Sequence, residues 1–147
     1  MTESAHERIR VDASAARCWD VAVDFESYPE WVRDVKEAKI LERDEEGRGK
    51  RVEFRAAALG KSVRYVLEYD YTEAPAALSW KFVEGEMLRR LDGTYRFEPE
   101  GPDSTRVHYD LAVDLAVPLP GLLKRRAAGL IMGSALKELK KQVEAVA

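Results

Sequence analysis

The middle of the chain, residues 35–117, alternates apolar and polar side chains in short runs that five turn signals separate. The turn signals contain glycine or proline and lie at residues 46–49, 60–61, 74–75, 85–86 and 101–103. Runs of this length bounded by such residues are typical of β-strands. Because short connections join antiparallel neighbours, the pattern predicts six consecutive antiparallel strands.

The glycine at residue 60 predicts the register of one strand pair. If residues 60–61 form a two-residue hairpin loop with glycine first, Phe54 lies opposite Leu67 and Val52 lies opposite Tyr69. One face of this pair is then apolar or aromatic, whereas the other face is charged. That alternation is typical of a sheet with one face in water.

A second glycine turn extends the apolar face to the next pair of strands. With residues 85–86 as the loop, Trp80 lies opposite Leu91 and Phe82 lies opposite Arg89. The alternation continues through the last strand, where the odd-numbered residues from 107 to 115 are apolar or tyrosine. The predicted inner face is rich in tyrosine and tryptophan, whose polar tips normally need a partner when they are buried.

Helices are expected at both ends of this strand-rich region. Residues 7–11 predict a short strand, and Ser14 is placed to cap a helix that runs to about Phe25. Pro29 predicts a break at Tyr28, with a second short helix on either side of it. Residues 119–147 have the composition of a helix about 25 residues long. Its apolar stripe changes side near residues 129–133, which predicts either a kink or two different packing partners.

Length and composition favour one ordinary domain, residues 1–147, of the α+β class. The chain is 46% hydrophobic and carries a formal net charge of −3, so no overall positive field would attract DNA or an anionic membrane. No run is apolar enough for a membrane span, and the start lacks the pattern of a secretory signal. The one cysteine, Cys18, suits a reducing compartment, so we expect a cytoplasmic protein. The histidines and the cysteine show no metal-ligand spacing, and no nucleotide-binding motif occurs, so no cofactor or metal is expected.

Several segments resemble a known superfamily. They are WDV at residues 19–21, DFESYPEWV at 24–32, LDGTYRF at 91–97 and PLPG at 118–121. Together they resemble the START-related (SRPBCC) superfamily of polyketide cyclases, dehydrases and lipid-transport proteins. The chain is most similar to small bacterial cyclase/dehydrase-like proteins, which themselves resemble coenzyme-Q-binding START proteins and ribosome-association toxins. The resemblance implies a helix-grip fold, in which a curved seven-stranded antiparallel sheet wraps around a long C-terminal helix and encloses a hydrophobic cavity.

The inner face has two interpretations. Periodicity alone favours a filled core, whereas the resemblance and the several tyrosine hydroxyls favour a pocket for an apolar ligand. Arg89 is the basic side chain expected on this face, where it could anchor an anionic oxygen, although it lies close enough to a turn to reach solvent instead. The candidate ligand-binding residues are Phe54, Tyr65, Leu67, Tyr69, Trp80, Phe82, Arg89, Leu91, Tyr95, Tyr109, Leu111 and Leu130.

The sequence predicts no catalytic residue. General acid–base catalysis needs a histidine or carboxylate in the pocket, but His108, Asp110 and Asp114 are expected to face outward. His6 lies near the chain start, which we expect to be disordered, and Cys18 is expected in the core. We therefore expect a protein that binds a hydrophobic small molecule such as a lipid, an isoprenoid or quinone, or a polyketide.

Two alternatives remain at this stage. One is a polyketide aromatase/cyclase or dehydratase that acts in the same cavity. The other is ribosome or RNA association through the basic run at residues 124–126, which the acidic net charge disfavours. The residues leave open whether the chain is a monomer or a homodimer.

Overall fold

Seven β-strands form one antiparallel sheet in the order β1-β7-β6-β5-β4-β3-β2. The computed structural model describes residues 2–58, 60–116 and 120–145, without the side chains of residues 2, 58, 124 and 127–134. The elements are β1 Thr2–Val11, α1 Ala15–Ala22, the 3-10 turn η1 Phe25–Ser27, α2 Tyr28–Trp31, β2 Val35–Arg43, β3 Gly49–Ala58, β4 Lys61–Asp70, β5 Ala77–Gly85, β6 Leu88–Gly101, β7 Ser104–Leu115 and α3 Gly121–Ala145.

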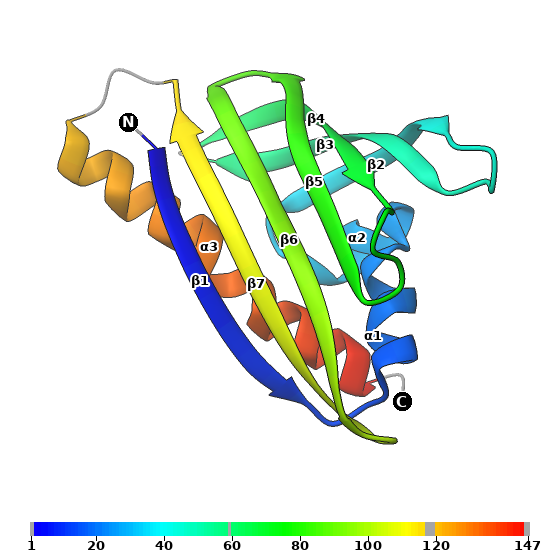
Figure 1. The fold of residues 1–147 in the computed structure, drawn as a ribbon. Coiled ribbons are helices and arrows are strands. Elements are labelled where there is room, and N and C mark those ends of the chain that lie inside the picture. Colours follow the sequence, from blue (N-terminus) through cyan, green and yellow to red (C-terminus); the bar gives the residue numbers. More distant parts are fainter. Residues whose placement is uncertain (1, 59, 117–119, 146–147) are drawn as a thin grey trace.

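The chain lays down β2 to β7 as a meander, and β1 pairs with the last strand, β7. Figure 1 shows the sheet curving around α3, with α1 and α2 beside the C-terminal end of that helix. This arrangement confirms the predicted α+β helix-grip fold. The first strand is longer than predicted, so that His6 lies within β1 opposite Asp110 and the expectation of a disordered start there is wrong.

The first helix follows its predicted cap. The Ser14 hydroxyl accepts a hydrogen bond from the Arg17 amide at 3.2 Å, and the helix buries Cys18 against the core. It ends at Ala22, earlier than predicted. The predicted break at Tyr28 is also wrong, because Tyr28 has helical angles (φ −52°, ψ −39°) and begins α2. Pro29 lies in the first turn of α2, where a missing amide hydrogen costs no helical hydrogen bond.

Both predicted hairpin registers are displaced by two residues. Ala58 pairs with Lys61 across residues 59–60, so Phe54 lies opposite Tyr65. Gly60 has a φ of +77°, a conformation that glycine adopts at little cost. In the same way, Trp80 lies opposite Gly93. Because side chains alternate with a period of two, a displacement by two residues keeps Phe54 and Trp80 on their predicted face.

The last helix covers the concave face of the sheet with the second of its two stripes. Leu136, Leu139 and Val143 are buried, whereas Leu123 is 44% exposed. The other side chains of the first stripe, at residues 119, 127, 130 and 131, lie outside the described residues. Over the described parts of the chain, no helix combines the length and apolar character that crossing a bilayer would need.

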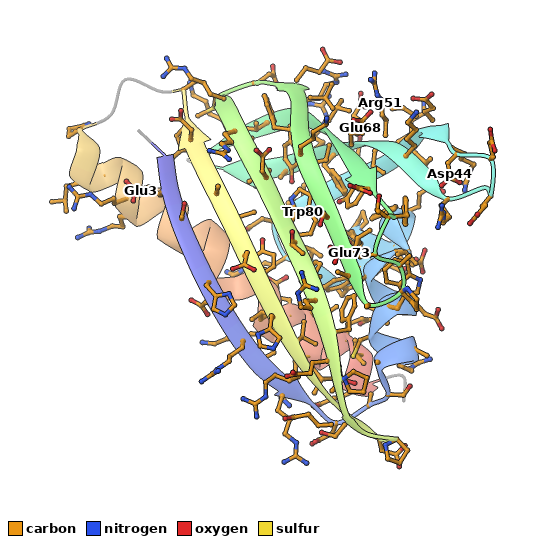
Figure 2. The ribbon with its side chains drawn as sticks, viewed as in Figure 1. Glu3, Asp44, Arg51, Glu68, Glu73 and Trp80 are labelled. Atoms are coloured by element: carbon orange, nitrogen blue, oxygen red, sulfur yellow. The ribbon has the colours of Figure 1, made fainter. Side chains whose placement is uncertain are left out.

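The convex face of the sheet is charged, as predicted. Arg51 Nε lies 3.3 Å from Glu68 Oε1 across β3 and β4, and Figure 2 shows these side chains on the outer surface. A second cross-strand pair joins Arg64 Nε to Glu53 Oε2 at 2.7 Å. The charged outer face therefore leaves the concave face as the site of the core and of any pocket.

Candidate functional site

A cavity of about 380 Å³ lies between the concave face of the sheet, helix α2 with the segment that follows it, and the C-terminal half of α3. Its wall is mostly apolar and aromatic. The presence of the cavity means that the protein's own side chains do not fill the interior completely. Nine of the predicted residues line it: Phe54, Tyr65, Leu67, Tyr69, Trp80, Leu91, Tyr95, Tyr109 and Leu111.

Arg89 does not face the cavity, and that prediction is wrong. Leu88 pairs with Leu115, but the next paired residue is Arg90, opposite Asp114, so Arg89 is the extra residue of a β-bulge. The bulge interrupts the alternation, and the Arg89 side chain is exposed to solvent.

Two other predicted residues are not part of the described wall. Phe82 packs half-buried against the core beside a register shift between β4 and β5, and it is absent from the cavity wall. The side chain of Leu130 lies outside the described residues.

Helical and loop residues form one side of the cavity, and this side was not predicted from the sequence. Tyr28 and Trp31 of α2, Asp34 in the following segment, and Glu138 of α3 all line it. The YPEW motif at residues 28–31 is the available signal, but it was interpreted as a chain break and as part of the superfamily resemblance, not as part of the cavity wall. Met87, also in the wall, has a φ of +61° in the turn between β5 and β6.

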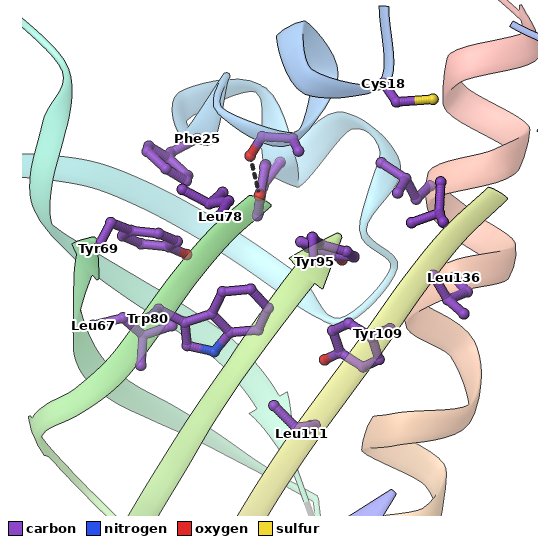
Figure 3. Packing of buried hydrophobic residues seen from close by; sticks show 14 of the residues in the cluster. Cys18, Phe25, Leu67, Tyr69, Leu78, Trp80, Tyr95, Tyr109, Leu111 and Leu136 are labelled. Atoms are coloured by element: carbon purple, nitrogen blue, oxygen red, sulfur yellow. Dashed lines mark hydrogen bonds between the residues drawn. The ribbon is translucent and has the colours of Figure 1, made fainter. Parts of the chain in front are cut away.

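Aromatic rings surround Trp80 on the cavity floor. Its ring centroid lies 5.3 Å from that of Tyr95 and 6.0 Å from those of Tyr69 and Tyr109. Tyr69, Trp80, Tyr95 and Tyr109 belong to β4, β5, β6 and β7, and Figure 3 shows their side chains close to one another in the core. Rings at these separations contact one another in tilted arrangements and form an aromatic surface against which an apolar group can pack.

The tyrosine hydroxyls of the site differ in their hydrogen bonds. The Tyr28 hydroxyl donates to the backbone carbonyl of Ala22. In contrast, Tyr69, Tyr95 and Tyr109 are only 7%, 8% and 6% exposed, and their hydroxyls have no hydrogen-bond partner among the described protein groups. None of these three hydroxyl oxygens is among the fully buried atoms that lack a partner, so each is open to the cavity and is available to a polar atom inside it.

The cavity tyrosines remain neutral at physiological pH. Burial raises the pKa of Tyr65, Tyr69, Tyr95 and Tyr109, because the phenolate would lose its hydration. The Asp34 carboxylate further raises the pKa of Tyr65, and Glu138 does so for Tyr95. Each hydroxyl can therefore both donate and accept a hydrogen bond.

The charged groups in the described cavity wall are both acidic. Glu138 is half-buried, and its Oε2 accepts a hydrogen bond from the Arg33 amide at 2.6 Å, which joins α3 to the segment after α2. Asp34 is exposed, and its backbone carbonyl accepts from the Ala57 amide at 2.8 Å. The two carboxylates thus lie at the solvent side of the cavity, whereas the unpartnered tyrosines lie deeper.

The other candidate groups lie away from the cavity. His108 and Asp110 are on the convex face, as predicted, where Asp110 hydrogen-bonds to His6 and His108 Nε2 lies 3.4 Å from Glu98 Oε1. Cys18 is fully buried in the core, and burial raises the pKa of its thiol. A search of the described side chains finds no group of three or more histidine, cysteine or acidic residues arranged to hold a metal ion.

The basic run at residues 124–126 is described only at its last two side chains. Arg125 and Arg126 are exposed, and Arg125 Nε lies 4.0 Å from Glu3 Oε1. The side chain of Lys124 lies outside the described residues. Contact with RNA through this run stays a prediction.

Comparison with known proteins identifies close structural relatives. The family model for polyketide cyclase/dehydrase and lipid transport matches residues 2–144. A START superfamily protein from Mycobacterium smegmatis is 27% identical with a TM-score of 0.90, over 98% of this chain and 99% of that chain. A protein from Thermus thermophilus is 26% identical with a TM-score of 0.83, over 99% of both chains.

A third solved structure shares the fold at lower identity. The Zhui aromatase/cyclase from a Streptomyces species is 14% identical with a TM-score of 0.83, over 98% of this chain and 94% of that chain. A comparison with curated protein sequences finds no match.

Proposed function

This chain belongs to the polyketide cyclase/dehydrase and lipid transport family, and from that premise we propose that it binds a ring-containing hydrophobic small molecule between the sheet and α3. The ligand carries at least one oxygen that hydrogen-bonds to the cavity tyrosines. The observation that carries the proposal is the set of three hydroxyls of Tyr69, Tyr95 and Tyr109 around Trp80, which belong to buried side chains, form no hydrogen bond to a described protein group and are open to the cavity.

The size and chemistry of the cavity support this proposal. A volume of about 380 Å³ is at the lower end of ligand pockets, which makes a compact ring system a better fit than a long two-chain lipid. The apolar wall would supply affinity by removing ligand surface from water, at about 25 cal/mol per Å² before the cost of association. The hydroxyls would supply orientation, because a ligand oxygen satisfies them and an unsubstituted hydrocarbon does not.

A direct test uses 2-naphthol as a probe, with binding followed by calorimetry. We expect the double variant Tyr95→Phe/Tyr109→Phe to bind 2-naphthol more weakly, while naphthalene binds as before. Arg89→Ala is the matched control, because Arg89 is exposed on a bulge and should leave both affinities unchanged. Absence of any saturable binding of either compound would overturn the proposal.

A second candidate function is cyclisation or dehydration of a poly-β-carbonyl chain, which the two carboxylates in the cavity wall favour. Glu138 would remove a proton from an activated carbon between two carbonyls, and a neutral tyrosine hydroxyl would hydrogen-bond to the resulting enolate oxygen. Glu138→Gln should then abolish turnover of such a chain while leaving its binding intact. Equal turnover in the variant and the wild type would exclude this role.

A further inference from the structure

The solvent side of the cavity carries negative charge that no described cation neutralises. Asp34 and Glu138 line the wall, and no lysine, arginine or histidine is present among the described lining residues. Neither carboxylate forms an ion pair with a described side chain. The nearby Lys36 Nζ instead donates to the backbone carbonyl of Arg33 at 3.2 Å.

The structure holds one of these carboxylates in place. Glu138 projects from α3, and its Oε2 accepts the Arg33 amide at 2.6 Å. This bond fixes the carboxylate beside the segment that carries Asp34, so two elements far apart in sequence contribute charge to the same opening. A carboxylate held by a backbone amide retains free lone pairs and can accept further hydrogen bonds from a ligand.

A separate observation indicates that a ligand reaches past these carboxylates. The side chains of Tyr95 and Tyr109 line the cavity and are over nine-tenths buried, and their hydroxyls, which are open to the cavity, have no partner among the described protein groups. The site thus has two layers: carboxylates at the solvent side and, deeper inside, aromatic rings, two of which carry these hydroxyls.

These layers match a molecule with a positive group at one end. Resting on the proposed function, we propose that the cavity takes a ring-containing amine, whose protonated nitrogen lies between Asp34 and Glu138 while its ring packs against Trp80. The same two carboxylates discriminate against carboxylate and phosphate ligands. Like charges at a partly buried site repel, and an anionic ligand would lose its hydration there without gaining a cationic partner.

The test compares three naphthalene probes of similar shape at pH 7: 2-(aminomethyl)naphthalene, 2-naphthalenemethanol and 2-naphthoate. Calorimetry should rank the amine tightest, the alcohol intermediate and the carboxylate weakest. We expect the dissociation constants of amine and carboxylate to differ by about tenfold or more, because two attractive contacts are replaced by two repulsive ones.

Variants assign that preference to the two carboxylates. Asp34→Asn/Glu138→Gln should bring the amine and carboxylate affinities close together, because the amine binds more weakly and the carboxylate more tightly than to the wild type. Glutamine at residue 138 retains an oxygen that can accept the Arg33 amide, so the local fold is kept. The control is Glu30→Gln, which removes an exposed charge on α2 that does not line the cavity.

The outcomes separate this inference from the proposed function. If the alcohol binds but the wild type binds the carboxylate as tightly as the amine, the inference is overturned and the proposed function stands. An amine preference that survives in the double variant also overturns it. If none of the three probes binds, the proposed function fails and the inference fails with it.

Discussion

The indole ring of Trp80 lies against Gly93 and occupies the space that a side chain at residue 93 would need. A Cβ built on Gly93 would lie 2.5 Å from Trp80 Cζ2 and 2.7 Å from the Asp110 carbonyl oxygen. The two residues pair directly across β5 and β6. The ring at the centre of the cavity floor therefore depends on the absence of a side chain on the neighbouring strand.

Gly93→Ala should destabilise the protein by about 1–3 kcal/mol, because the added methyl group must displace the indole ring or the backbone of β7. Thermal unfolding should show a lower Tm, and near-ultraviolet circular dichroism should report the moved ring. In a Trp80→Phe background the cost of the same substitution should be smaller, since the smaller ring leaves room. An unchanged Tm for Gly93→Ala would contradict the steric argument.

Removing a hydroxyl should have opposite consequences at Tyr28 and Tyr109. Tyr28→Phe leaves the Ala22 carbonyl without its buried donor, so we expect a loss of about 1–2 kcal/mol in the free energy of unfolding. Tyr109→Phe removes a hydroxyl that is open to the cavity and has no described protein partner, and should be neutral or stabilising without ligand. Urea denaturation of both variants is the measurement. A destabilised Tyr109→Phe protein would show that this hydroxyl has a structural partner.

The ionisation of Glu144 should make the free energy of unfolding depend on pH in the acidic range. Hydrogen bonds from Lys140 Nζ, at 2.6 Å, and from the Asp12 amide, at 2.8 Å, hold the pKa of this carboxyl below its ordinary value of 4.5. Because the folded-state pKa is the lower one, the stabilisation is complete above pH 4.5 and is lost as the pH falls through the folded-state value.

The variant Glu144→Gln should therefore be less stable than the wild type at neutral pH, and the difference should shrink as the solution is acidified below about pH 4. Urea denaturation at a series of pH values measures this. The same change at the exposed Glu45 serves as the control. A stability difference that is independent of pH would rule out the ionised carboxylate as its source.

Cys18 should not react with a thiol reagent while the protein is folded. Its side chain is fully buried against the core, so the reagent cannot reach the sulfur. Desolvation also raises the pKa of the thiol, so little of it is in the reactive thiolate form. We expect Ellman's reagent to label it only at the rate of unfolding, and rapidly in denaturant. Fast labelling under native conditions would show that α1 opens readily.

The sequence was sufficient for the fold and for much of the sheet side of the cavity wall, because both depend on alternation, which each strand carries in its own residues. The periodicity of β7 placed Tyr109 and Leu111 inside and His108 outside, as the structure has them. Two hairpin registers were displaced by two residues, yet Phe54 and Trp80 kept their faces, since an even displacement preserves the alternation.

Only the tertiary structure decided which polar groups meet at the cavity. A bulge, which depends on how two strands pair, turned Arg89 out to solvent. Asp34 and Glu138 are 104 residues apart in the sequence and face the same cavity because α3 packs beside the segment after α2. Local periodicity determines the side of a strand on which a residue lies, whereas the charge at the mouth of the cavity depends on contacts between elements that no local pattern encodes.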